Sequence, residues 1–98
     1  MKHMKIMGHD YALVMNPDLQ REMATPGACC AGTLKIQIDP GAPESRKEEA
    51  LLHEIIEALK YHLDLELKHD KLSALSEGLY QVLRDNQLMS SWKERLQA

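Results

Sequence analysis

The chain has 98 residues, with 12 Lys and Arg against 15 Asp and Glu, and a formal net charge of −3. This length allows one domain with one core, and 44% hydrophobic and 28% charged residues exclude wholesale disorder. The acidic balance argues against a nucleic-acid surface built on bulk charge, and the sequence lacks the run of about 20 apolar residues that spans a bilayer. We therefore expect a single domain over residues 1–98 with no membrane partner and, by bulk charge, no nucleic-acid partner, although a small basic patch can still form in three dimensions.

The N-terminus and the cysteines favour a cytoplasmic protein. Residues 1–5 are basic but lead into a short strand-like stretch instead of the apolar core of a signal peptide. Cys29 and Cys30 are adjacent, and such pairs rarely form a useful disulfide. We expect both thiols to be reduced, as is usual in the cytoplasm.

The first half of the chain predicts strands. Residues 4–7 and 11–15 are short apolar runs on either side of Gly8-His9-Asp10, which indicates an antiparallel hairpin. Residues 18–32 carry little periodicity, and Thr25-Pro26-Gly27 marks a loop. Apolar and polar residues alternate over residues 33–39, which predicts a strand with one buried face.

The second half predicts two helices. Ser45 and Glu48 have the spacing of a capping box, so the first helix should begin at Ser45 and run to about Leu67. Asp70 is a good N-cap for a second helix, which runs to about Asn86.

Apolar residues recur in both helices at the spacing of a buried face. The predicted core positions are Leu52, Ile55, Ile56, Leu59 and Leu63 in the first helix and Leu72, Leu75, Leu79, Val82 and Leu83 in the second. Ser91 and Glu94 are expected to cap a last short helix that carries Trp92 and Leu96. The predicted fold is α+β, a small antiparallel sheet packed on a helical hairpin.

His53, Glu54 and Glu57 are the strongest candidates for chemistry. Residues four apart share one face of a helix, so His53 and Glu57 can bind one ion, and imidazole and carboxylate are both zinc ligands. Glu54 lies one step round the helix, where the H-E-x-x-H arrangement holds the general base of a metalloprotease. The same spacing also fits a solvated polar face made of His53, Glu57, Lys60 and Asp64.

Two longer motifs carry a family resemblance. The segments Leu51-Leu52-His53-Glu54-Ile55-Ile56-Glu57-Ala58-Leu59 and Gly78-Leu79-Tyr80-Gln81-Val82-Leu83-Arg84-Asp85-Asn86, following the strand of residues 33–39, resemble small phage and prophage proteins. Those proteins are similar to the minimal zincin-type metallopeptidases of the ImmA/IrrE kind. The resemblance covers residues 33–86, a little over half of the chain.

The resemblance implies a zincin-like fold, with His53 and Glu57 as zinc ligands and Glu54 as catalytic base. Glu57 stands where the family more commonly has His. A carboxylate there lowers the net charge of the site and can weaken the acidification of a zinc-bound water.

A catalytic zinc site needs a third protein ligand. His69, where the chain turns into the second helix, is our candidate; Glu77 is the runner-up, and Asp64 and Asp70 are acidic alternatives. Tyr80 is expected to lie at the rim of the helix packing, with donation to an oxyanion as its alternative role.

The two cysteines also allow two interpretations. Cys29 and Cys30 are expected to be a small buried pair, and a thiolate ligand is the alternative.

Three functions fit these observations. The first is a zinc-dependent metallopeptidase-like protein of phage or mobile-element origin that acts on a peptide or protein, with Glu54 activating the attacking water. The second is a non-catalytic accessory protein with a zincin-like fold that binds a protein partner. The third is a helical-hairpin interaction module in which His53 and Glu57 are merely solvated.

Overall fold

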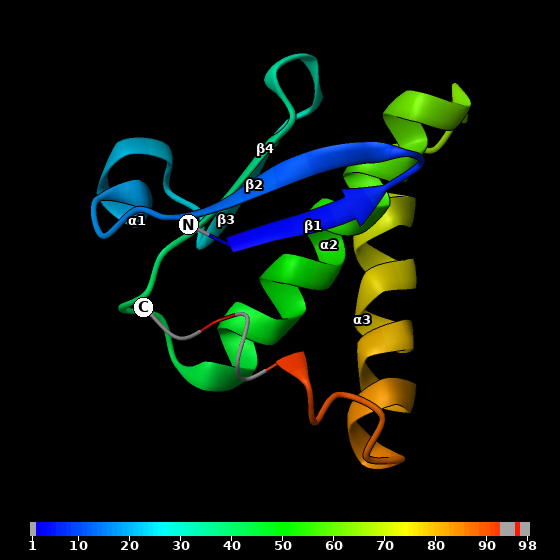
Figure 1. Cartoon of the computed structure of the whole chain (residues 1–98). Coiled ribbons are helices and arrows are strands. Elements are labelled where there is room, and N and C mark those ends of the chain that lie inside the picture. The colour runs from blue at the N-terminus through cyan, green and yellow to red at the C-terminus, as the bar shows by residue number, and fades with distance from the viewer. Residues whose placement is uncertain (1, 93–95, 97–98) are drawn as a thin grey trace.

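The computed structural model describes residues 2–92 and 96. Its four-stranded sheet has the order β1-β2-β4-β3, formed by Lys2–Ile6 (β1), His9–Met15 (β2), Gly27–Cys30 (β3) and Lys35–Ile38 (β4). Two long helices, α2 (Glu44–Leu63) and α3 (His69–Asp85), complete the fold; α2 packs on the sheet, and α3 packs mainly on α2 (Figure 1). The shorter elements are α1 (Leu19–Met23) and a 3₁₀ turn, η1 (Ala31–Thr33).

The α+β prediction is confirmed, but the sheet is mixed, where the sequence predicted it to be antiparallel. β2 and β4 are parallel, while β1 and β3 pair antiparallel with their neighbours. Parallel strands need a long crossover, and residues 16–34 provide one. This crossover contains α1 and β3, which the weak periodicity of residues 18–32 did not predict. β3 is a run of small residues without apolar alternation.

The N-terminal hairpin forms as predicted, with a tighter turn. Only Met7 and Gly8 separate β1 from β2, and both have positive φ, 51° and 80°. This is the backbone that a two-residue hairpin loop requires. β4 begins at Lys35, one residue after Leu34, whose φ of 55° is left-handed.

Two apolar clusters lie on either side of α2. The cluster between α2 and the sheet contains Ile6, Tyr11, Leu13, Ile36, Ile38, Ala50, Leu51, Ala58 and Leu96. The cluster between α2 and α3 contains Leu52, Ile56, Leu72, Tyr80 and Met89. Helix α2 is therefore apolar on two sides, and Leu63, predicted to be buried, is 47% exposed at the end of the helix.

The helix ends differ from the predicted ones. α2 begins at Glu44 after Pro43 and has no side-chain cap, so the predicted capping box does not form. Glu48 instead accepts a hydrogen bond from the Tyr80 hydroxyl at 2.8 Å. α2 ends at Leu63, not at Leu67, because Asp64 adopts a left-handed conformation that Asp tolerates.

Helix α3 buries only part of the predicted face: Leu72 is buried, and Leu83 packs against the cluster between α2 and α3. It begins at His69, after Lys68, and its buried side chains are Leu72, Ser76 and Tyr80. The predicted core positions Leu75, Leu79 and Val82 are 54%, 39% and 46% exposed. The side chains of Ser76 and Tyr80 are both hydrogen-bonded to side chains of α2, which accompanies the burial of this side of the helix.

The last predicted helix lies partly outside the described residues, since Glu94 is not among them. Trp92 packs against both apolar clusters, and Leu96 is buried. Over the part of the chain that the structure describes, no helix combines the length and apolar character needed to cross a bilayer.

Candidate metal centre

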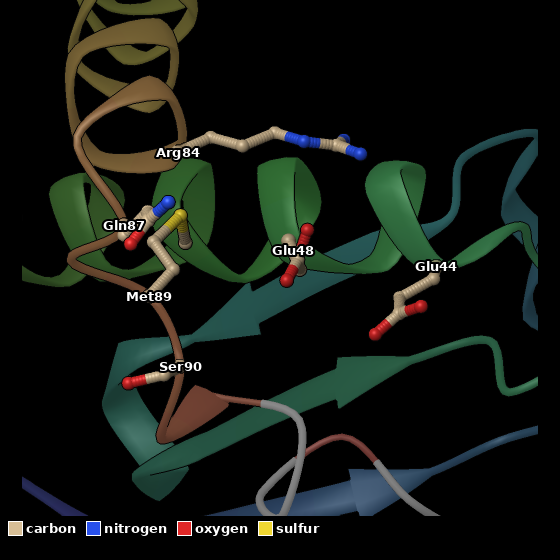
Figure 2. Close-up of a pocket in the computed structure, with 6 residues that line it drawn as sticks. All are labelled: Glu44, Glu48, Arg84, Gln87, Met89 and Ser90. Atoms are coloured by element: carbon tan, nitrogen blue, oxygen red, sulfur yellow. The ribbon is translucent and has the colours of Figure 1, made fainter.

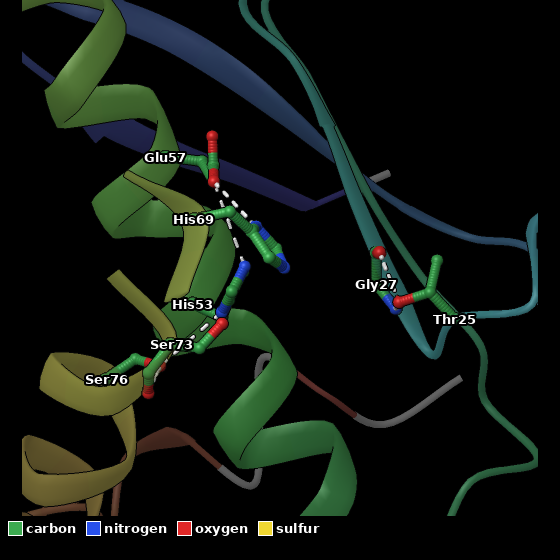
Figure 3. Close-up of polar contacts among 7 residues, drawn as sticks. All are labelled: Thr25, Gly27, His53, Glu57, His69, Ser73 and Ser76. Carbon is green, nitrogen blue, oxygen red and sulfur yellow. Dashed lines mark hydrogen bonds and ion pairs between the residues drawn. The ribbon is translucent and has the colours of Figure 1, made fainter. Parts of the chain in front are cut away.

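His53, Glu57 and His69 converge where the middle of α2 meets the first residue of α3 (Figure 3). Each offers one ligand atom, and these atoms all lie within 4.8 Å of one another. His53 Nε2 and His69 Nδ1 are each 3.9 Å from Glu57 Oε1. Helical spacing brings His53 and Glu57 together, and the short connection after α2 returns His69 to the same place.

The donor set fits a divalent metal ion. Four ligands at about 2.0–2.1 Å in tetrahedral geometry lie roughly 3.3 Å from one another. The two distances of 3.9 Å to Glu57 therefore need to shorten by about 0.6 Å, and donors as much as 4.8 Å apart by up to about 1.5 Å. The side chains of His53 and Glu57 are 20% and 29% exposed, whereas that of His69 is 78% exposed. His69 is therefore free to make that movement, and the group could hold a metal ion with one position open to solvent.

Ser76 fixes the orientation of the His53 ring. The Ser76 hydroxyl donates to the carbonyl oxygen of Ser73 at 3.0 Å, and its oxygen lies 3.4 Å from His53 Nδ1 (Figure 3). Because the hydroxyl proton is engaged, the oxygen can only accept from Nδ1–H. This tautomer leaves the Nε2 lone pair of His53 pointing toward Glu57.

Burial also keeps His53 neutral. Desolvation lowers the pKa of His53, and His69 lowers it further, while Glu57 acts in the opposite direction. A neutral imidazole is the form that binds a metal ion.

Glu54 lies beside this group and is only 7% exposed. Burial, with a smaller contribution from the Glu57 carboxylate, raises the pKa of Glu54 to about 7. β3 packs closely here, since a Cβ on Gly27 would lie 3.2 Å from Glu54 Oε2 and 3.1 Å from the Cβ of Ala50. The absence of a side chain at Gly27 therefore lets the strand lie against this carboxylate.

A pocket of about 180 Å³ opens beside Glu54. Its lining comes from the segment before β3 and from the same side of α2 and α3: Thr25, Pro26, Arg46, Glu49, Ala50, His53, Glu54 and His69. This volume is smaller than a typical small-molecule site. The pocket suits a water molecule or part of a side chain, with the rest of a ligand lying across the surface.

The other acidic candidates do not join this group. Among the described residues, Glu77, Asp64 and Asp70 are all exposed and belong to no metal-binding cluster. Asp64 lies in the connection between the two helices, and Asp70 and Glu77 lie on α3. Their spacing in the sequence could not show which of them, if any, reaches His53 and Glu57.

The cysteines are free, but the prediction of a buried pair is wrong. Cys29 is half-buried and Cys30 is exposed, because successive side chains of β3 point to opposite faces. Burial and the nearby Glu54 and Glu57 carboxylates raise the pKa of Cys29 to about 12. Cys29 therefore remains a thiol at neutral pH and is a poor metal ligand in this state.

Tyr80 is buried, not at the rim of the helix packing. Its hydroxyl donates to Glu48 Oε1 and accepts from Arg84 Nη1, both at 2.8 Å. Glu48 and Arg84 face a separate pocket of about 390 Å³ that Glu44 also lines (Figure 2). The Tyr80 hydroxyl is therefore engaged in joining α3 to α2.

A second histidine pair was missed by sequence reasoning. His62, near the end of α2, hydrogen-bonds to the fully buried Tyr11 of β2 and stacks on His9, with ring centroids 4.6 Å apart. These residues are separated by about 50 positions along the chain, so no local pattern brings them together. The partners become visible only when α2 packs on the sheet.

Comparisons with protein-family models, curated proteins and solved structures found no match. The geometry of the centre therefore carries the functional argument.

Proposed function

We propose that this protein is a zinc-dependent metallopeptidase-like hydrolase in which His53, Glu57 and His69 bind Zn²⁺ and Glu54 is the general base. The observation that carries this proposal is the convergence of two imidazoles and one carboxylate within 4.8 Å beside a buried carboxylate. The resemblance to ImmA/IrrE-type peptidases, a phage or mobile-element origin and a cytoplasmic location belong to the same proposal, since each rests on the sequence alone.

The choice of zinc follows from the ligands. Two imidazoles with one carboxylate and one open position are a common catalytic zinc set. Zn²⁺ bound there supplies a Lewis acid that acidifies a water and polarises a carbonyl oxygen. Ser76 supports this by holding the His53 ring through Nδ1, as outer-shell partners of zinc ligands do.

Glu54 is suited to accept a proton. It lines the pocket, and its side chain is largely buried there. A base that shares this pocket with His53 and His69 can take a proton from an attacking water and pass it to a leaving amine. A pKa of about 7 places Glu54 between its two protonation states at neutral pH.

The small pocket points to a polymeric substrate bound across the surface. Its volume of about 180 Å³ holds little more than one group, so most contacts with a substrate must be made outside it. A peptide meets this requirement because it is extended. The same small pocket favours the second candidate, a non-catalytic accessory protein that binds a folded partner.

The test compares the wild type with Glu54→Gln, using Glu77→Gln as a matched control on the exposed side of α3. Zinc content and cleavage of a broad peptide library are measured for all three proteins, purified without a His-tag or chelator. We expect all three to bind one zinc ion. We expect cleavage to fall by roughly 10²–10⁴-fold in Glu54→Gln only.

Two results would contradict parts of the proposal. Loss of zinc from Glu54→Gln would make Glu54 a ligand and not a base. A zinc-loaded wild type that cleaves no peptide would remove the peptidase function and leave the accessory protein.

A further inference from the structure

Helix α3 carries a continuous apolar face that the rest of the described chain does not cover. Leu75, Leu79 and Val82 follow one another at i, i+4 and i+7, and they are 54%, 39% and 46% exposed. α3 packs mainly on α2, and none of the other described elements lies against its outer side (Figure 1). Exposed apolar stripes of this kind mark contact surfaces more often than scattered apolar residues do.

Gly78 lies in the middle of this exposed face. A Cβ built there meets nothing within 4 Å, so the fold of one copy does not require a glycine at this position. A glycine in a helix interior is nevertheless unfavourable relative to alanine. Ala74, one turn earlier, is also small and exposed, so the two leave a shallow notch beside Leu75 and Leu79. Such a notch allows another backbone or a large side chain to approach closely.

The charges along the face are self-complementary. Lys71 lies at its N-terminal end and Asp85 at its C-terminal end, and both are exposed. Asp85 accepts one hydrogen bond, from Gln81 at 3.0 Å, through Oδ2 only. If a second α3 lies antiparallel to the first, each Lys71 comes beside an Asp85 of the other copy. A parallel arrangement would instead bring like charges together.

The apolar residues fit the same arrangement. With the two-fold axis between positions 78 and 79, Leu75 faces Val82 of the other copy. Leu79 then lies over Gly78 of the other copy, where the notch accepts it. A single two-fold operation therefore pairs large with small residues and positive with negative ones, as an isologous interface requires.

We infer that the exposed face of α3 is the contact surface of a symmetric dimer, in which the α3 helices of two copies pack antiparallel. This inference is independent of the metal centre, because none of the residues on the face is a candidate ligand or base. A single helix pair buries less surface than a standard protein interface, so the dimer is expected to be concentration-dependent.

Sedimentation equilibrium of the wild type over a wide concentration range tests the dimer directly. We expect the mass to rise from 11.2 kDa toward twice that value as the concentration increases. Leu79→Lys should remain a monomer throughout, because it places a charge in the notch of the other copy. Met23→Lys, which removes a 55% exposed apolar residue from α1, is the matched control and should dimerise like the wild type.

Charge exchange tests the antiparallel register. Lys71→Glu alone and Asp85→Lys alone should each weaken the dimer by roughly 3- to 10-fold, because each creates two like-charge contacts. The double variant Lys71→Glu, Asp85→Lys should regain the wild-type dissociation constant. Circular dichroism verifies that α3 remains folded in each variant.

Three results would overturn the inference. They are a wild type that stays at 11.2 kDa at millimolar concentration, a dimer that survives Leu79→Lys, and a double charge variant weaker than either single one. A wild type that stays monomeric would mean that the exposed face of α3 binds a different protein and not a second copy of this chain.

Discussion

The molecule contains two histidine pairs, and they differ in what their nitrogen atoms face. His53 and His69 lie at an angle of 65° to each other with a carboxylate oxygen 3.9 Å from one nitrogen of each ring. His9 and His62 are stacked almost parallel, at 16° and 4.6 Å between centroids, and His62 Nε2 is bonded to the Tyr11 hydroxyl. Among the described residues, neither ring of the second pair forms an ion pair with a carboxylate.

This difference decides what each pair can do. A metal ion needs lone pairs that point at one place and an opening through which the ion can enter. The first pair has both, because His69 is exposed and the His53 tautomer is set from behind by Ser76. In the second pair the stacked faces offer no lone pair, and the Nε2 atom of His62 is engaged with Tyr11. Two histidines that lie close together are therefore not enough to identify a metal site; the directions of their nitrogen lone pairs must also be known.

The largest effect is expected from removing a ligand of the first pair. His53→Ala or Glu57→Ala should abolish stoichiometric zinc binding, because each removes one of three protein ligands. His62→Ala should leave zinc binding unchanged, since that ring lies in the second pair. Isothermal titration with Zn²⁺ measures all three affinities. Zinc binding that survives in the double variant His53→Ala, Glu57→Ala would place the metal elsewhere.

The buried carboxylate beside the first pair gives a pH dependence. The folded pKa of Glu54, about 7, lies above its ordinary value of 4.5, so the folded state holds this proton more tightly than the unfolded state does. The contribution of Glu54 to the free energy of unfolding should therefore fall as the pH rises from about 4.5 to about 7, by about 3 kcal/mol at most, and then stay constant.

Urea unfolding of chelator-treated protein at several pH values measures this contribution. The stability of Glu54→Gln relative to the wild type should increase over the same pH window, whereas Glu77→Gln, on the exposed side of α3, should follow the wild type. A stability difference between Glu54→Gln and wild type that does not change with pH would mean that Glu54 titrates in the folded state as it does in water.

The contrast between the two pairs also explains what the sequence could predict. His53 and Glu57 lie four residues apart on one helix, so periodicity alone predicts their common face with Glu54 one step round the helix, and His69 follows from the short connection between two helices. The His62–Tyr11 contact joins α2 to β2 and has no local signal. The same holds for β3 and for the buried face of α3, where Ser76 and Tyr80 contact α2 in place of the expected Leu75 and Leu79.

A smaller effect is expected at Ser76, which contacts the first pair without being a ligand. Ser76→Ala removes the acceptor for His53 Nδ1–H and should lower zinc affinity by roughly 10- to 100-fold. Ser73→Ala is the control, because the hydrogen bond between Ser76 and Ser73 uses the main-chain carbonyl oxygen of Ser73, which the substitution keeps. Isothermal titration gives the two affinities. If Ser76→Ala and Ser73→Ala bind zinc with equal affinity, Ser76 does not contribute to the metal centre.

The smallest effect concerns the second pair and is confined to stability. Tyr11→Phe removes the hydroxyl that bonds to His62 while keeping the buried ring, and His62 is exposed enough for water to replace the lost partner. We expect the free energy of unfolding to fall by about 1 kcal/mol, the usual contribution of one such hydrogen bond. Tyr61→Phe is the control, because the Tyr61 side chain is 62% exposed and its loss of a hydroxyl should change stability by less than about 0.5 kcal/mol.

Chemical denaturation gives the free energy of unfolding of both variants, and titration with Zn²⁺ gives their zinc affinities. Because the Tyr11–His62 contact fastens the end of α2 to the sheet and makes no contact with the metal group, zinc affinity should not change. A fall in zinc affinity in Tyr11→Phe would show that the two histidine pairs are coupled through α2.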